Sequence, residues 1–323
     1  MSRSRLVNLV GIVIGVAGIA FVATRILRDR DAIADAMSSA EVGWLVIGGA
    51  AGTTAMTLIG LNWLWILRHA GAATPWRRAM AWYFVGQLGK YVPGGIWPIV
   101  GQAELAHRDA TPRGAAYSST AMSMVTNLLG AASVAAISGL VTPTDHRLAS
   151  AAIAVLLASL FVAIAVPAVG RAIARLARRV TTRELRLPDP RWFALVIARH
   201  LPVWFAFAGM NVFAVVALGV DVDGPLVVEL IFVTCVSWMA GFVVVGVPGG
   251  IGVRETIFIS MTTATLGAGV AVSAAVLSRV VSIAVDLSGA AVSATVARTA
   301  PAVAVATVDG RADAVAHDRY AAP

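Results

Sequence analysis

Long apolar stretches recur along the chain, and short segments that carry most of its charges separate them. Stretches long enough to span a membrane occur at residues 6–24, 44–67, 115–140, 148–170, 192–218 and 270–297. A helix needs about 20 mainly apolar residues to cross a bilayer. The pattern therefore predicts six membrane-spanning helices, the first of which lacks a small-residue cleavage pattern and is interpreted as a retained anchor.

Two further segments combine apolar sequence with residues that break helices. The pentapeptide Val-Pro-Gly-Gly-Ile stands at residues 92–96 and again at 247–251. Proline and glycine interrupt a helix and leave backbone groups without partners. The polar segment around the first copy, residues 76–106, predicts a re-entrant hairpin. Residues 226–266, around the second copy, are more apolar and form either two crossings or a second re-entrant hairpin.

A second landmark recurs in the same order as the pentapeptide. Asn127-Leu-Leu-Gly-Ala-Ala follows the first copy and Asp286-Leu-Ser-Gly-Ala-Ala follows the second, so the two landmarks recur at offsets of 155 and 159 residues. This register indicates a duplicated fold, with a first repeat at about 76–170 and a second at about 192–298. We expect residues 1–298 to form a single integral membrane domain and the charged, Ala-rich and Val-rich residues 299–323 to form a disordered tail.

Composition and charge support a membrane protein and set its expected orientation. The chain has 59% hydrophobic and 13% charged residues and a mean hydropathy of +0.82, values outside the soluble range. Its net charge is +8, and the basic residues lie between the apolar stretches. This placement indicates topology signals rather than nucleic-acid binding. Seven arginines in the 170–191 segment predict a cytoplasmic loop. The expected location is the inner (cytoplasmic) membrane, multi-pass, with both termini cytoplasmic.

In this orientation the helix with Asn127 runs outward and the helix with Asp286 runs inward, so the repeats are inverted. Inverted repeats with broken helices are a transporter architecture whose site lies near the membrane midplane, where half-helix N-termini face anionic groups. The predicted fold class is an all-α polytopic membrane protein with about six full spans, two broken or re-entrant hairpins and a transporter-like inverted repeat. The glycines of both pentapeptides are candidate substrate-binding residues: Gly94, Gly95, Gly249 and Gly250.

Charged residues within apolar sequence are the other candidates, because they are costly in a membrane. Lys90, the only lysine, either binds a phosphate or reaches the interface as a snorkelling side chain. Arg254 and Glu255 follow the second glycine pair and form either a lipid-phosphate site or an internal ion pair that locks the hairpin. Arg279 and Asp286 lie about two helical turns apart on one face. With Arg254 and Glu255 they form a polar cluster that either binds substrate or only pairs its own opposite charges.

Asn127, which corresponds to Asp286 in the first repeat, is a further substrate-binding candidate, with a helix-to-helix hydrogen bond as the alternative. The five histidines are scattered singly, so no metal site is expected. The sequence shows no phosphate-binding loop, nucleophile elbow or zinc-protease helix. We therefore expect no cofactor, no ATP-driven pump and no enzyme.

Residues 89–97, residues 247–255, Arg279 and Asp286 resemble the flippase-like transmembrane region of the lysylphosphatidylglycerol synthase family, over roughly residues 44–295. In two-domain members this region is thought to move an aminoacylated lipid that a soluble domain makes. The resemblance implies a stand-alone member without the synthase domain. It also implies a lipid flippase or transporter that moves an anionic phospholipid or polyprenyl-phosphate-linked precursor between leaflets.

Two other functions stay open at this point. The first is a non-transporting membrane scaffold that recruits a separately encoded lipid-modifying synthase or glycosyltransferase through the basic 170–191 segment. The second is an intramembrane lipid-modifying enzyme that uses Glu255 and Asp286 as acid and base. Transport would survive charge changes in the basic segment, whereas scaffolding would not.

Overall fold

The computed structural model describes residues 30–38, 40–92, 97–108, 111–141, 189–244 and 247–298, together with a few single positions outside these ranges. All regular secondary structure in these ranges is helical. The elements are α2 (Arg30–Ser38), α3 (Val42–His69), α4 (Trp76–Gln87), the 3-10 turn η1 (Leu88–Tyr91), α5 (Trp97–Arg108), α6 (Arg113–Val141), α9 (Pro190–Ala217), α10 (Gly224–Val243), the 3-10 turn η2 (Pro248–Gly250), α11 (Val253–Leu266) and α12 (Ala268–Arg298).

Within the described ranges, five helices are long and apolar enough to cross a membrane: α3, α6, α9, α10 and α12. Four of them confirm the spans predicted at 44–67, 115–140, 192–218 and 270–297. The spans predicted at 6–24 and 148–170 and the tail at 299–323 lie outside the described residues. The protein is an all-helical polytopic membrane protein.

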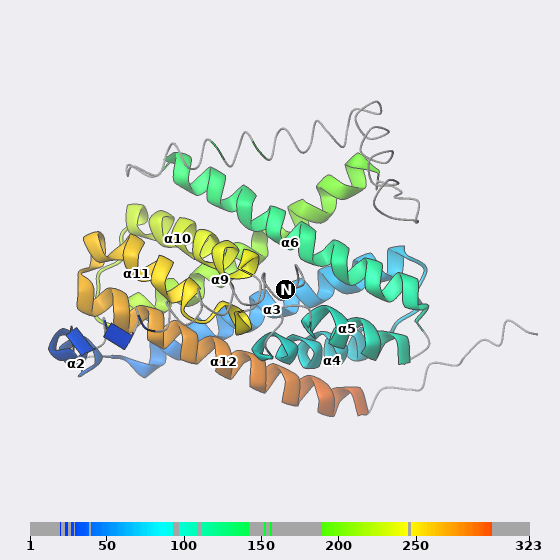
Figure 1. Ribbon diagram of the computed structural model, residues 1–323, viewed down its shortest axis with the longest axis horizontal. Helices are drawn as coiled ribbons and strands as arrows, with labels where there is room; N and C mark the ends of the chain where they lie inside the picture. The colour runs from blue at the N-terminus through cyan, green and yellow to red at the C-terminus, as the bar shows by residue number, and fades with distance from the viewer. Residues whose placement is uncertain are drawn as a thin grey trace, which may run out of the picture.

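The two broken segments fold as helical hairpins at opposite ends of the molecule. Helices α4 and α5 pack together in one half of its long axis, and α10 and α11 pack together in the other half (Figure 1). Their turns, η1 and η2, contact each other near the middle of the long helix α12. Although α10 has span length, its C-terminal end lies at this central level. Helices α10 and α11 thus form a hairpin whose turn lies at this level.

The helix ends and connections lie at the two ends of the molecule's long axis, and one of these ends carries most of the arginines. Arg113 of α6 lies 3.7 Å from Glu104 of α5, whereas at the other end the backbone N–H of Glu41 donates to the Ala217 carbonyl at 2.8 Å. The first end gathers the helix ends that carry Arg68, Arg77, Arg78, Arg108, Arg113 and Arg191. The second end holds the 218–223 connection. Helices α6 and α12 run in opposite directions between these ends (Figure 1).

Small residues allow the helices to approach closely. A Cβ atom at Gly289 of α12 would lie 2.5 Å from the Phe84 ring of α4, and one at Gly130 of α6 would lie 2.8 Å from His200 Cβ of α9. In lipid, apolar burial alone gives little drive for helix association, and close van der Waals packing replaces it. The abundance of glycine and alanine is therefore a packing requirement of this fold.

Cysteine labelling checks the assignment of the two ends. Cys235 is buried, so a Cys235→Ala background supports single cysteines at two exposed positions, Ala73 in the α3–α4 connection and Asp221 in the α9–α10 connection. Ala73→Cys and Asp221→Cys should react with a membrane-impermeant maleimide from opposite sides of sealed vesicles, with Ala73→Cys on the cytoplasmic side. Labelling of both from one side would contradict the topology.

Candidate functional site

Three glycines with positive φ form the turn between α10 and α11. Gly249, Gly250 and Gly252 have φ values of 58°, 69° and 83°, a left-handed region that costs other residues roughly 1–2 kcal/mol each. The N–H of Gly252 donates to Glu255 Oε2 at 2.6 Å. Glu255 therefore caps the first turn of α11, where a carboxylate also interacts favourably with the positive end of the helix dipole.

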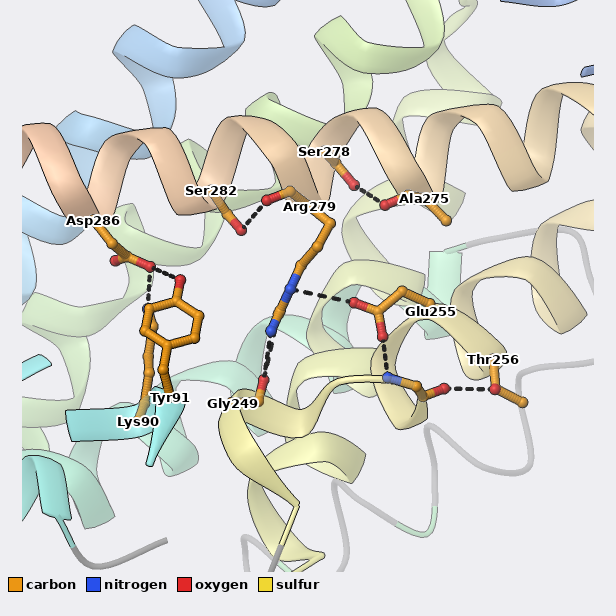
Figure 2. A network of polar contacts seen from close by, with 11 residues as sticks. Lys90, Tyr91, Gly249, Glu255, Thr256, Ala275, Ser278, Arg279, Ser282 and Asp286 are labelled. Carbon is orange, nitrogen blue, oxygen red and sulfur yellow. Dashed lines mark hydrogen bonds and ion pairs between the residues drawn. The ribbon is translucent and has the colours of Figure 1, made fainter. Parts of the chain in front are cut away.

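Arg279, from the middle of α12, holds this turn in place. Its two terminal nitrogens donate to the Gly249 carbonyl at 3.3 and 3.4 Å, and its Nε lies 3.6 Å from Glu255 Oε1. Figure 2 shows the Arg279 side chain extending from α12 to both partners. Glu255 is thus paired with Arg279 of another helix and not with its neighbour Arg254. The alternative interpretation, an internal ion pair between Arg254 and Glu255, is not what the structure shows, because the Glu255 carboxylate points to the cap and to α12.

The first hairpin is tied to the same face of α12. Lys90 Nζ lies 2.6 Å from Asp286 Oδ2, and the Tyr91 hydroxyl donates to the same oxygen at 2.5 Å. Asp286 is only 2% exposed, and burying a carboxylate without such partners is costly. The two hairpins therefore meet on one helix, Lys90 at Asp286 and the second turn at Arg279 (Figure 2).

Arg254 differs from the other cations because it has no anionic partner. Its guanidinium carbon lies 5.5 Å from the centre of the Trp238 ring, and a Cβ at Gly241 or Gly250 would lie 2.5 or 2.8 Å from its side chain. The buried Nε has no hydrogen-bond partner. Arg254 makes no ion pair with any residue that the structure describes. A desolvated guanidinium of this kind favours an anionic ligand, which it can bind with two parallel hydrogen bonds.

These side chains line a cavity of about 70 Å³ between the two hairpins and helices α3, α9 and α12. That volume is several times the roughly 10–15 Å³ that one water molecule requires. Its charged lining residues are Lys90, Arg254, Glu255, Arg279 and Asp286. Three cations and two carboxylates leave one surplus positive charge in the cavity. Within the described ranges, no three His, Cys, Asp or Glu side chains gather to hold a metal ion.

The structure brings most of the sequence-predicted site residues together and leaves others apart. All five predicted charged residues line the cavity, and Gly249 and Gly250 form the turn beside it. Asn127 lies elsewhere: its backbone oxygen accepts from Trp204 Nε1 at 3.1 Å, and it does not line the cavity. Gly94 and Gly95 lie outside the described residues.

Three residues of the site escaped the sequence analysis. Tyr91 shares the Asp286 oxygen with Lys90, and Ser237 and Trp238 line the cavity from α10. The available signals were the position of Tyr91 directly after the only lysine and the presence of a serine and a tryptophan inside a very apolar helix. Neither signal distinguishes a site residue from an interfacial aromatic or a small packing residue.

One known protein family matches most of this chain. The family model described as the lysylphosphatidylglycerol synthase transmembrane region matches residues 8–288. The chain belongs to this family. The matched range includes both Val-Pro-Gly-Gly-Ile pentapeptides, Arg279 and Asp286. The resemblance noted in the sequence rested on these residues. Among curated proteins, none matches this chain. Membership of the lysylphosphatidylglycerol synthase transmembrane-region family and the five span-length helices together establish a multi-pass membrane protein.

The turn glycines generate a stability prediction. Gly250→Ala places a methyl group 2.8 Å from Arg254 Nε and 3.0 Å from the Gly241 backbone at a positive φ. The control is Gly219→Ala, which has a similar φ of 77° but no atom within 4 Å of the added carbon. We expect Gly219→Ala to lose roughly 1–2 kcal/mol from backbone strain alone and Gly250→Ala to lose clearly more, measured by thermal unfolding in detergent. Equal losses would argue against tight packing of Arg254 in the turn.

The ion pair between the first hairpin and α12 generates a second prediction. Lys90→Met leaves the buried Asp286 carboxylate without its cation, which costs about 3–5 kcal/mol in buried pairs; Asp286→Asn leaves the Lys90 ammonium, which is 23% exposed and should cost less. The double variant removes both charges and should be more stable than either single variant. A double-mutant cycle of unfolding free energies measures this coupling. Additive losses would show that Lys90 and Asp286 do not stabilise each other.

Proposed function

We propose that this chain moves an anionic phospholipid or a polyprenyl-phosphate-linked precursor between the two leaflets of the membrane. The observation that carries the proposal is Arg254, a guanidinium with a buried Nε that forms no ion pair with the described residues, in a cavity whose described lining carries one surplus positive charge. A phosphate group supplies the missing anion and two oxygens for bidentate hydrogen bonds. Membership of the lysylphosphatidylglycerol synthase transmembrane-region family supports a lipid as the source of that phosphate.

The arrangement of the hairpins supports an inverted repeat. We infer that α4, η1, α5 and α6 form one unit and that α10, η2, α11 and α12 form the other. The hairpins occupy opposite halves of the molecule, their turns touch, and α6 and α12 run in opposite directions. Together with the recurring pentapeptide, these features are those of transporters whose site lies near the midplane between two repeats.

The two ion pairs suggest how the cavity opens alternately to each side. The Lys90–Asp286 pair holds the first hairpin on α12, and Arg279 holds the second hairpin through Gly249 and Glu255. Release of one hairpin at a time would expose Arg254 to one leaflet while the other hairpin keeps the opposite path closed. The headgroup would pass through the cavity while the lipid chains stay in the bilayer, and transport would be downhill or ion-coupled.

Lipid transport in proteoliposomes tests this function. The assay follows an anionic lipid with a fluorescent acyl chain, whose signal an impermeant reductant removes from the outer leaflet. Arg254→Ala should slow transport roughly tenfold or more, because a hydrogen bond to a charged group contributes about 1.5–3 kcal/mol. Arg108→Ala is the matched control, since Arg108 is 74% exposed at one end of the molecule. Undiminished transport by Arg254→Ala at equal protein levels would show that Arg254 does not bind the transported lipid.

A further inference from the structure

A cation outside the cavity lies on the outer face of the molecule, where α3 packs against α9. Arg199 is the tenth residue of α9, a helix of span length, and its side chain is exposed. Leu195, one helical turn before it, is 52% exposed, and Leu61 of the adjoining α3 is 38% exposed. An apolar surface of this kind on spanning helices faces the lipid. Arg199 is therefore a charge on the lipid-facing surface, where charges are costly.

Two contacts with α3 hold Arg199 in one orientation. Its Nε donates to Asn62 Oδ1 at 3.2 Å, and the Asn62 amide nitrogen donates to the Arg199 carbonyl at 2.8 Å. Asn62 is only 4% exposed, so this reciprocal pair fixes the side chain from the protein side. The guanidinium carbon lies 4.9 Å from the centre of the Trp65 ring, a cation–π distance. The ring and the asparagine thus position the guanidinium without neutralising its charge.

The two terminal nitrogens of Arg199 remain for a ligand. Nη1 and Nη2 make no hydrogen bond or ion pair with any residue that the structure describes. Together they form a planar fork that matches two oxygens of one phosphate group. A positioned guanidinium with an unused fork therefore favours a phosphate over a single point charge.

The aromatic rings of this face place the guanidinium near the level of the lipid headgroups. At the arginine-rich end of the molecule, α3 ends and α9 begins. Trp65 stacks on Trp192 with ring centres 5.6 Å apart, and Trp192 stacks on His69 at 4.5 Å. Tryptophans near the ends of spanning helices typically lie at the membrane interface. Arg199 starts about 13 Å from the beginning of α9, and its side chain reaches back to this aromatic stack.

We propose that this surface, the α3–α9 site formed by Asn62, Trp65, Trp192 and Arg199, binds the phosphate of a phospholipid of the surrounding bilayer. The Arg199 fork binds two phosphate oxygens, and the lipid chains lie along the exposed leucines. The lipid comes from the leaflet at the arginine-rich end. Because the contacts reach only the phosphate, the site accepts phospholipids with different headgroups.

The α3–α9 site is separate from the central cavity, since none of its four residues lines that cavity. It does not depend on the transport proposed above. The bound phospholipid supplies the anion that Arg199 lacks and joins the end of α3 to the beginning of α9. It is a resident lipid of the fold and not the transported one.

Native mass spectrometry of the purified full chain with short-chain lipids tests the α3–α9 site. Dioctanoyl phosphatidylcholine carries the phosphate, and dioctanoylglycerol has the same chains without it. Arg199→Gln should weaken phosphatidylcholine binding roughly tenfold or more, as the loss of hydrogen bonds to a charged group predicts, and should leave dioctanoylglycerol binding unchanged. An excess of inorganic phosphate, the other source of this group, should not displace the lipid.

Arg77→Gln is the matched control and should bind phosphatidylcholine as the wild type does. Arg77 is also exposed and lies 5.6 Å from a tryptophan ring, but in the first turn of α4 and not within a span-length helix. Arg199→Lys keeps the charge without the fork. It should bind more weakly than wild type and more tightly than Arg199→Gln, and it carries the test if Arg199→Gln does not fold.

An Arg254→Ala background separates the α3–α9 site from the central cavity. The effect of Arg199→Gln should be the same in this background as in the wild type. An effect that disappears there would place the lipid in the cavity and overturn the inference. Equal phosphatidylcholine binding by wild type, Arg199→Lys and Arg199→Gln, or displacement of the lipid by inorganic phosphate, would also overturn it.

Discussion

A charge buried among apolar helices must have a partner, and in this protein that constraint determines how the hairpins are placed. Arg279 and Asp286 lie in the middle of α12, where unpaired charges are expensive. Each finds its partners on a different hairpin, Asp286 on Lys90 and Tyr91, and Arg279 on Gly249 and Glu255. Helix α12 is therefore the common support of both broken elements, and its two ionic contacts fix the two turns side by side.

The glycine-rich turn makes the second of these contacts possible. Gly249, Gly250 and Gly252 adopt backbone conformations that other residues adopt only with strain, and the missing side chains let Arg254 lie against Gly241 and Gly250. Glu255 is engaged by the helix cap and by Arg279 and makes no ion pair with Arg254. Arg254 is thus left without an ion-pair partner among the described residues, and this cation is the basis of the proposed anion site.

Much of the fold was predictable from the sequence because membrane spans depend on length and hydropathy alone. The stretches that became α3, α6, α9 and α12 required no knowledge of tertiary contacts. The prolines and glycines of the repeated pentapeptide likewise indicated where helices would break. The five charged site residues could be selected because few side chains of that kind occur in apolar sequence, and the cost of burying them points to a role.

The partners of those residues could not be predicted, because they depend on which helix faces meet. The sequence left open whether Arg254 and Glu255 pair with each other; in the structure Glu255 turns back to cap α11, and Arg254 lies on Trp238. The repeat register suggested Asn127 as a substrate-binding counterpart of Asp286, but Asn127 lies where α6 packs on α9 and does not line the cavity.

The most direct test of the central claim is a cryo-EM structure of the full chain in nanodiscs that contain an anionic phospholipid. The account predicts that both hairpin turns lie near the bilayer midplane against α12 and that phosphate density lies within hydrogen-bond distance of Arg254. Hairpin turns at a membrane surface, or lipid phosphates seen only at the two interfaces with Arg254 paired to a protein carboxylate, would contradict it.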